Sequence, residues 1–171
     1  MKIAFFGYDL YHPCLAQIRA LGHRLSAIFS GPLSVHTQHV HQFAAYNAIP
    51  VIDEKPAPSM LNDLVNDGVE LFLCAEYPWK IPIPDGLRYG INLHPTMLPE
   101  GRGPTPIPWL FLQYPQHAGL SIHKLSNRFD AGDILLQQSI RLKADDNYDC
   151  YCQKLVQLAS DMLPAVLNNL A

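Results

Sequence analysis

Three polar residues in the second half of the chain have the types and spacing needed for chemistry on a carbonyl group. Asn92 and His94 lie two positions apart at the end of an apolar run, immediately before Pro95, and Asp130 follows on a glycine-containing turn. Residues i and i+2 of a strand point to the same face, so the carboxamide and the imidazole should project together. A hydrogen-bond donor, a titratable ring and a carboxylate form a minimal set for acyl-type transfer.

Each of these side chains has an expected part in such chemistry. Asn92 has two N–H groups that can donate to an oxygen that becomes negative during attack on a carbonyl. If Asp130 lies near His94, its charge should raise the pKa of that ring and favour the imidazolium, a second donor to the same oxygen. Asp130 could also hold a water or accept the proton lost by an attacking amine. Taken singly, an Asn-x-His pair occurs by chance, and Asp130-Ala-Gly-Asp133 is a common turn composition.

The first half of the chain alternates short apolar runs with helical patterns. Apolar runs bounded by turn residues predict strands, and apolar residues at helical spacing that stop at glycine predict helices. Short connections between them favour a parallel sheet covered on both faces. The predicted strands are 2–6, 24–29, 50–52 and 71–75, and the predicted helices are 11–21, 35–46 with Ser34 as its N-cap, and 58–67.

The second half of the chain continues with a strand that carries the candidate site. This strand, Gly90–Leu93, would end where ligands gather in an open parallel sheet. A helix over 104–112, a hairpin of 117–125 with 133–142, and a long amphipathic helix within 144–170 follow. We therefore predict one α/β domain over residues 1–171. Its fold would be a doubly wound, mostly parallel, Rossmann-like sheet with a C-terminal β-hairpin and long helix.

Composition narrows the class of protein. The chain has 171 residues, a hydrophobic fraction of 49% and a formal charge of −3, which fits a folded domain and gives no electrostatic footprint for nucleic acid. It shows no signal peptide and no membrane-span pattern, so a cytoplasmic protein is expected. The four cysteines are expected to be reduced and buried. A solvated helix face explains His36, His39 and His41 better than a metal site, and we predict no metal.

Several segments together resemble the 10-formyltetrahydrofolate-dependent formyltransferases, the family of methionyl-tRNA, glycinamide ribonucleotide and sugar-nucleotide N-formyltransferases. The matching residues are Ile91-Asn92-Leu93-His94-Pro95-Thr96-Met97-Leu98-Pro99, Gly101-Arg102-Gly103, Pro106-Ile107-Pro108-Trp109 and Phe129-Asp130-Ala131-Gly132-Asp133-Ile134-Leu135. The resemblance implies that Asn92, His94 and Asp130 are the catalytic trio. A substrate amine would attack the formyl carbon, Asn92 and His94 would stabilise the oxyanion, and Asp130 would keep His94 charged. Asp133 matches the second, non-catalytic acid of the family motif.

The same resemblance implies that 10-formyltetrahydrofolate is the co-substrate. Its pterin would occupy an apolar pocket formed largely by the backbone of two loops. Trp79, in the first of these loops, could instead be an ordinary exposed aromatic residue. The bond between Leu98 and Pro99 is a candidate cis peptide. The cofactor-binding residues implied are Trp79, Lys80, Ile81, Ser126, Asn127, Arg128, Phe129 and Asp130.

The acceptor is narrowed by departures from the family pattern. The segment after the first strand, which includes Tyr8, Asp9 and Tyr11, lacks the small residues of the glycinamide ribonucleotide phosphate loop, and the acid would repel phosphate. The chain also stops before the position of a tRNA-binding domain. We therefore expect the amine of a small metabolite, such as a sugar nucleotide, and no nucleic-acid partner. Tyr8, Asp9, Tyr11 and Arg102 are the candidate substrate contacts, with an ordinary solvated arginine as the alternative for Arg102.

Two other functions remain open at this point. A hydrolase that releases formate from the same co-substrate would need the same trio. A non-catalytic folate- or metabolite-binding module is a further alternative, although such a module has no need for all three residues. The sequence does not indicate the oligomeric state.

Overall fold

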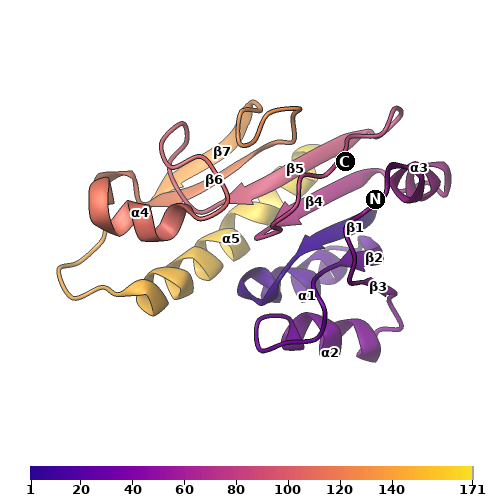
Figure 1. Cartoon of the computed structure of the whole chain (residues 1–171), viewed down its shortest axis with the longest axis horizontal. Coiled ribbons are helices and arrows are strands. Elements are labelled where there is room, and N and C mark those ends of the chain that lie inside the picture. Colours follow the sequence, from indigo (N-terminus) through magenta and orange to yellow (C-terminus); the bar gives the residue numbers. More distant parts are fainter. Residues whose placement is uncertain (171) are drawn as a thin grey trace. The chain divides into compact units, whose positions relative to one another are not determined.

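A computed structural model describes residues 1–170 (Figure 1). The backbone contacts group into two compact units, residues 1–91 and residues 92–170. Strand β5 (Tyr89–His94) crosses from one unit into the other. The expectation of a single domain over residues 1–171 therefore stays a prediction.

The strands form a seven-stranded sheet in the order β3-β2-β1-β4-β5-β6-β7. In the first unit, β1 (Lys2–Gly7) pairs in parallel with β2 (Arg24–Phe29) and with β4 (Leu71–Ala75), and β2 pairs in parallel with β3 (Val51–Ile52). In the second unit, β6 (Gly119–Lys124) pairs antiparallel with β7 (Ile134–Ser139). The α/β class, the mostly parallel sheet and the C-terminal hairpin are thus confirmed.

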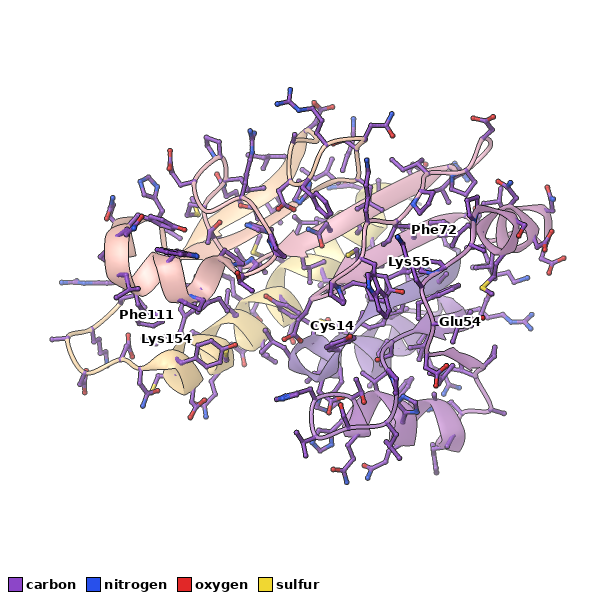
Figure 2. All side chains as sticks on the ribbon, viewed as in Figure 1. Cys14, Glu54, Lys55, Phe72, Phe111 and Lys154 are labelled. Atoms are coloured by element: carbon purple, nitrogen blue, oxygen red, sulfur yellow. The ribbon has the colours of Figure 1, made fainter. Side chains whose placement is uncertain are left out.

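Strands β1, β2 and β4 of the first unit are buried along most of their length, as their continuous apolar sequences require, whereas the short β3 is half-buried. Phe6 of β1 stacks on Phe29 of β2 with ring centroids 4.5 Å apart, and Phe72 of β4 packs at a tilt on the other side of Phe6, 5.1 Å away. Figure 2 labels Phe72 and the buried Cys14 within this unit. These aromatic contacts join three adjacent strands into one core layer.

The helices of the first unit end in the same way. They are α1 (Pro13–Ala20), α2 (Gln38–Tyr46) and α3 (Pro58–Asn66), with a short 3₁₀ turn, η1 (Asp9–Tyr11), before the first. Each is closed by a Schellman motif, in which the residue after the C-cap takes positive φ. Gly22 and Gly68 fill this position after α1 and α3, whereas Ala48 fills it after α2 with φ of 52°. The bonds Ile49 N→Ala44 O and Val69 N→Leu64 O complete two of the motifs.

The start of α2 differs from the sequence expectation. The helix begins at Gln38 with Thr37 as its N-cap, not at residue 35 after Ser34. The Ser34 hydroxyl instead contacts Thr37 Oγ1 at 3.1 Å. The helical amides are capped from a distance, because the two carboxylate oxygens of Asp9 accept bonds from the backbone N–H groups of His39 (3.0 Å) and Val40 (2.9 Å). Asp9, which is remote in sequence, therefore caps α2 in place of the predicted Ser34.

The second unit contains the long helix α5 (Tyr148–Leu170), which packs against β6 and β7 (Figure 1). Helix α4 (Pro106–Gln113) and the 3₁₀ turn η2 (Pro115–His117) connect β5 to β6. The buried stripe on α5 includes Tyr151, Leu155, Leu158 and Met162. Cys150 and Cys152 are only half-buried, so the expectation that all four cysteines are buried is wrong for these two. Within residues 1–170 no helix is long and apolar enough to cross a bilayer.

Candidate active site

The second unit brings Asn92, His94 and Asp130 together. Asn92 and His94 are carried by β5, and Asp130 lies on the turn between β6 and β7. Asp130 Oδ1 accepts a hydrogen bond from Asn92 Nδ2 at 3.2 Å and lies 3.5 Å from His94 Nδ1. His94 is 4% exposed and Asp130 is 9% exposed. A buried carboxylate thus contacts both members of the strand pair.

The loop that follows β5 encloses this group. Its Gly101 carbonyl accepts a bond from His94 Nε2 at 2.7 Å, and its Gly103 N–H donates to Asp130 Oδ2 at 2.9 Å. Because a carbonyl only accepts, His94 Nε2 carries a hydrogen and Nδ1 is the nitrogen that faces Asp130. Arg102 lies between these two glycines and is exposed. The loop therefore fixes both the ring orientation of His94 and the position of the carboxylate.

A second layer of bonds holds the loop in place. Ser121 Oγ donates to Thr96 O at 2.6 Å and accepts from Leu98 N at 3.0 Å, and Thr96 Oγ1 donates to Glu100 O at 2.6 Å. The expected cis peptide between Leu98 and Pro99 is present. Ser121 and Thr96 are fully buried, so their hydroxyls act as internal ties and not as solvent contacts.

Tyr151 of α5 ties the end of β5 to β6. Its hydroxyl donates to Pro95 O at 2.9 Å, accepts from Gly119 N at 3.0 Å and lies 3.1 Å from Gly119 O. The ring is packed edge-on against Phe111 of α4, which Figure 2 labels, with centroids 5.8 Å apart. Pro95 directly follows His94, so this buried phenol supports the backbone beneath the imidazole.

The turn that carries Asp130 has little freedom. Asp130 takes a left-handed conformation with φ of 48°, which Asp tolerates better than most residues. A Cβ at Gly132 would lie 1.9 Å from the Lys124 carbonyl oxygen, so only glycine fits there. Asp133 pairs with Lys124 Nζ at 2.9 Å and its side chain is 80% exposed. The two acids of this turn therefore have different roles: Asp130 faces the site and Asp133 faces solvent.

The pKa of His94 differs from the sequence expectation. Burial lowers the pKa of His94, and the neighbouring Asp130 and Gly101 carbonyl only partly oppose it, while His123 and Arg102 lower it further. Asp130 does raise the pKa of His94, as expected. The overall shift is downward, contrary to the expectation, because burial outweighs Asp130. Burial alone would raise the pKa of Asp130, but the bonds and charges of His123, His94 and Gly103 hold it below its ordinary value.

His123 is a member of this site that sequence reasoning missed. It lies at the end of β6 and is 1% exposed. Its Nε2 is 3.1 Å from Asn92 Nδ2 and 3.5 Å from Asp130 Oδ1. Both N–H groups of Asn92 are therefore directed at protein atoms, not at an open position. The alternation along β6 places His123 on the same face as the buried Ser121, a signal that could have pointed to it.

The residues implied to bind folate fall in both units. In the first, the loop after β4 carries Trp79, half-buried and edge-on to Tyr77 at 5.4 Å, the exposed Lys80, and Ile81, which is buried. Trp79 is thus not a freely exposed aromatic. In the second, Ser126 Oγ donates to Arg128 O at 2.6 Å and Phe129 is 56% exposed, next to Asp130. The residues at this turn that expose their side chains are Asn127, Arg128 and Phe129.

Three of the four candidate substrate residues follow β1. The strand order reverses between β1 and β4, and ligands of open α/β sheets bind where this happens. Tyr8 is half-buried there, Tyr11 is 1% exposed, and the Asp9 carboxylate caps α2. Glu76, which sequence reasoning did not single out, follows β4 with φ of 61° and accepts a bond from Leu10 N at 3.1 Å.

The histidines near α2 have specific contacts. His36 precedes the helix and so lies outside the helix face that was predicted to carry all three histidines. His39 stacks on His12 with centroids 4.8 Å apart, and His41 Nε2 lies 3.0 Å from the Gly31 carbonyl oxygen. Within the part of the chain that the structure describes, no three His, Cys, Asp or Glu residues are grouped to hold a metal ion.

Comparison with known proteins defines the family. Residues 46–167 match the family model described as formyl transferase. The methionyl-tRNA formyltransferase of Anaplasma marginale is 30% identical over 190 residues, which cover 99% of this chain and 61% of that protein. That of Ehrlichia chaffeensis is 44% identical over 84 residues, 48% of this chain and 28% of that protein. The chain belongs to the formyl transferase family, and it spans less than two thirds of the length of these relatives.

Solved structures share the fold at low sequence identity. The phosphoribosylglycinamide formyltransferase of Bacillus halodurans superposes with a TM-score of 0.81 at 18% identity, covering 99% of this chain and 95% of that one. A sugar N-formyltransferase from Shewanella superposes with a TM-score of 0.75 at 18% identity, covering 99% of this chain and 69% of that one. At these identities the likeness concerns the fold alone.

Proposed function

We propose that the chain transfers a formyl group from 10-formyltetrahydrofolate to a primary amine of a small metabolite, such as an amino-sugar nucleotide. The observation that supports this most directly is the buried contact of Asn92 and His94 with Asp130 inside one compact unit. Membership of the formyl transferase family supports the reaction class.

The trio supplies what the reaction needs. The amine lone pair attacks the formyl carbon, a C–N bond forms, and the carbonyl π electrons move to oxygen. An Asn92 N–H donates to that oxygen, and the positive charge of protonated His94 stabilises it. Asp130 takes a proton from the attacking nitrogen, through a water. The oxygen lone pair then re-forms the C=O bond, the bond from the formyl carbon to N10 breaks with its electron pair going to N10, and N10 takes up the proton held by Asp130. A formamide and tetrahydrofolate leave.

The co-substrate would be held by residues of the right chemistry. In the first unit we assign Trp79 to the flat ring and Lys80 to the glutamate tail, on the loop that also carries the buried Ile81. In the second unit the backbone of Ser126–Asp130 offers polar groups, and Arg128 offers a positive charge. No metal has a part in this assignment, because the charge that develops on oxygen is met by N–H donors.

The identity of the acceptor amine is the more specific part of the proposal. Arg102 and Tyr8 are the contacts we assign to it, whereas the carboxylate of Asp9 and the buried Tyr11 are more closely tied to the fold. Net charge of −3 favours a small metabolite over a polyanion. Methionyl-tRNA is the second candidate, because the relatives in Anaplasma marginale and Ehrlichia chaffeensis are methionyl-tRNA formyltransferases.

The test is incubation of the purified chain with 10-formyltetrahydrofolate and a panel of amines. The panel contains an amino-sugar nucleotide, glycinamide ribonucleotide and methionyl-tRNA, and tetrahydrofolate, formate and formylated amine are measured together. We expect one formamide to form in step with tetrahydrofolate, and His94→Asn to abolish it while His117→Asn does not. Formate without formamide would assign a hydrolase. Absence of any turnover, with folate still bound, would assign a binding module.

A further inference from the structure

One ring nitrogen of His123 has a fixed hydrogen-bond partner, and the other can either accept or donate a hydrogen bond. Its Nδ1 lies 2.8 Å from the Lys124 carbonyl oxygen. A carbonyl only accepts, so Nδ1 carries a hydrogen in both the neutral and the charged ring. The other nitrogen, Nε2, lies between Asn92 Nδ2 at 3.1 Å and Asp130 Oδ1 at 3.5 Å. The protonation state of His123 is therefore decided at the nitrogen that meets Asn92.

We propose that His123 is a positioning residue whose protonation sets the hydrogen bonding of the Asn92 carboxamide. In the neutral ring, Nε2 accepts one Asn92 N–H while Asp130 accepts the other. In the charged ring, Nε2–H donates to Asp130 and can no longer accept. One Asn92 N–H is then released and becomes available to an oxyanion. The catalytic use of this switch rests on the proposed formyl transfer, but the switch itself does not.

A carboxylate and a second imidazole face His123. Asp130 Oδ1 lies 3.5 Å from its Nε2, and the ring centroid of His94 lies 6.3 Å from its own. Lys124 meets His123 only through its carbonyl, since its ammonium pairs with Asp133. Arg102 adds positive charge near His94. Asp130 thus supplies one negative charge beside two imidazole rings, and a developing oxyanion supplies a second.

Nuclear magnetic resonance on the full chain tests the switch without any turnover. The ring nitrogens of ¹⁵N-labelled protein report the tautomer and charge of each histidine, and Asn92→Asp identifies the Asn92 side-chain signals by their loss. We expect neutral His123 to carry its proton on Nδ1. One Asn92 amide proton should shift with the same midpoint as His123 Nε2. An Asn92 signal that does not follow His123, or a proton on Nε2 of the neutral ring, would overturn the proposal.

Kinetics of His123→Gln tests the consequence, because glutamine can accept from Asn92 but cannot become charged. We expect kcat to fall about 10- to 100-fold, less than the roughly 100- to 1,000-fold loss when an oxyanion donor is removed outright, with KM for 10-formyltetrahydrofolate unchanged within about twofold. The pH profile of kcat should also lose one ionisation. His117→Gln, on η2 in the same unit, is the matched control and should change neither. An unaltered kcat and pH profile in His123→Gln would refute the role, whereas an inactive parent chain would refute only the proposed function.

Discussion

His94 Nδ1 lies 3.5 Å from Asp130 Oδ1, and both side chains are less than a tenth exposed. The other ring nitrogen of His94 donates to Gly101 O, so the charge of the ring is decided on the side that meets the carboxylate. Burial and Asp130 act in opposite directions on this ring. The carboxylate therefore limits how far burial lowers the pKa of His94.

Replacement of Asp130 by Asn should abolish most of the activity. Asparagine tolerates the left-handed backbone at this position and keeps the shape of the side chain, so the loss reports the charge and not the fold. We expect kcat/KM to fall about a thousandfold, which lies within the range for a positioned acid–base group. The matched control is Asp133→Asn, which removes only an exposed ion pair and should stay within about twofold. Equal losses in both variants would contradict the assignment.

The free energy of unfolding should fall as the pH drops below the pKa of free imidazole. The pKa of His94 is below its ordinary value of 6.5, so the unfolded chain binds a proton near that pH while the folded ring does not. The free energy of unfolding therefore rises with pH between the folded-state pKa and about 6.5. His23 shifts in the same direction, and Asp130 adds a loss below about pH 3.9 as its depressed pKa is crossed.

Urea unfolding at a series of pH values measures this dependence. In His94→Gln the slope below about pH 6.5 should become smaller, leaving the part due to His23. A slope that is the same in the variant and the parent would show that His94 does not contribute.

Removal of the Tyr151 hydroxyl should cost both stability and activity. The Gly119 N–H would lose its buried acceptor and Pro95 O its donor, so we expect Tyr151→Phe to lower the free energy of unfolding by about 1–3 kcal/mol. The end of β5 would also be held less firmly, so kcat should fall, though less than in Asp130→Asn. Tyr46→Phe, at a residue that is 90% exposed, should change stability by no more than about 0.5 kcal/mol. Denaturant unfolding of the two variants separates these outcomes.

One substitution at the end of α2 should stabilise the folded protein. Ala48 occupies the left-handed position of a Schellman motif with φ of 52°, where glycine has no steric cost. We expect Ala48→Gly to raise the free energy of unfolding by about 0.5–1 kcal/mol, since the relief of strain exceeds the extra entropy of the unfolded chain. The reverse change at the equivalent position after α3, Gly68→Ala, should lower it by about 1 kcal/mol, although no atom lies within 4 Å of the added Cβ. Loss of stability in Ala48→Gly would contradict this account.

Much of the fold could be predicted because its signals are local. The predicted strands 24–29 and 71–75 coincide with β2 and β4, since each is a continuous apolar run between turn residues. The start of α2 was mistaken because its cap, Asp9, is remote in sequence, and no local pattern reveals a carboxylate that arrives from another segment. Local signals thus locate elements better than they locate the bonds that end them.

The candidate site divides in the same way. Asn92 and His94 could be paired from their spacing on one strand, and the contact with Asp130 follows the expected motif. His123 was missed because it comes from a neighbouring strand and its importance depends on which atom its ring faces. The net direction of the His94 pKa was mistaken because the degree of burial is a property of the packed site.

The carboxylate of Asp9, held against the first amides of α2, has a consequence for substrate choice. The chain supplies its own counter-anion to this helix end, so the partial positive charge there is already neutralised before any ligand arrives. A phosphate group could bind at this helix end only by displacing an anion that is covalently part of the protein. The phosphates of a nucleotide acceptor must therefore be held elsewhere, and replacing Asp9 by a neutral residue would remove this competition.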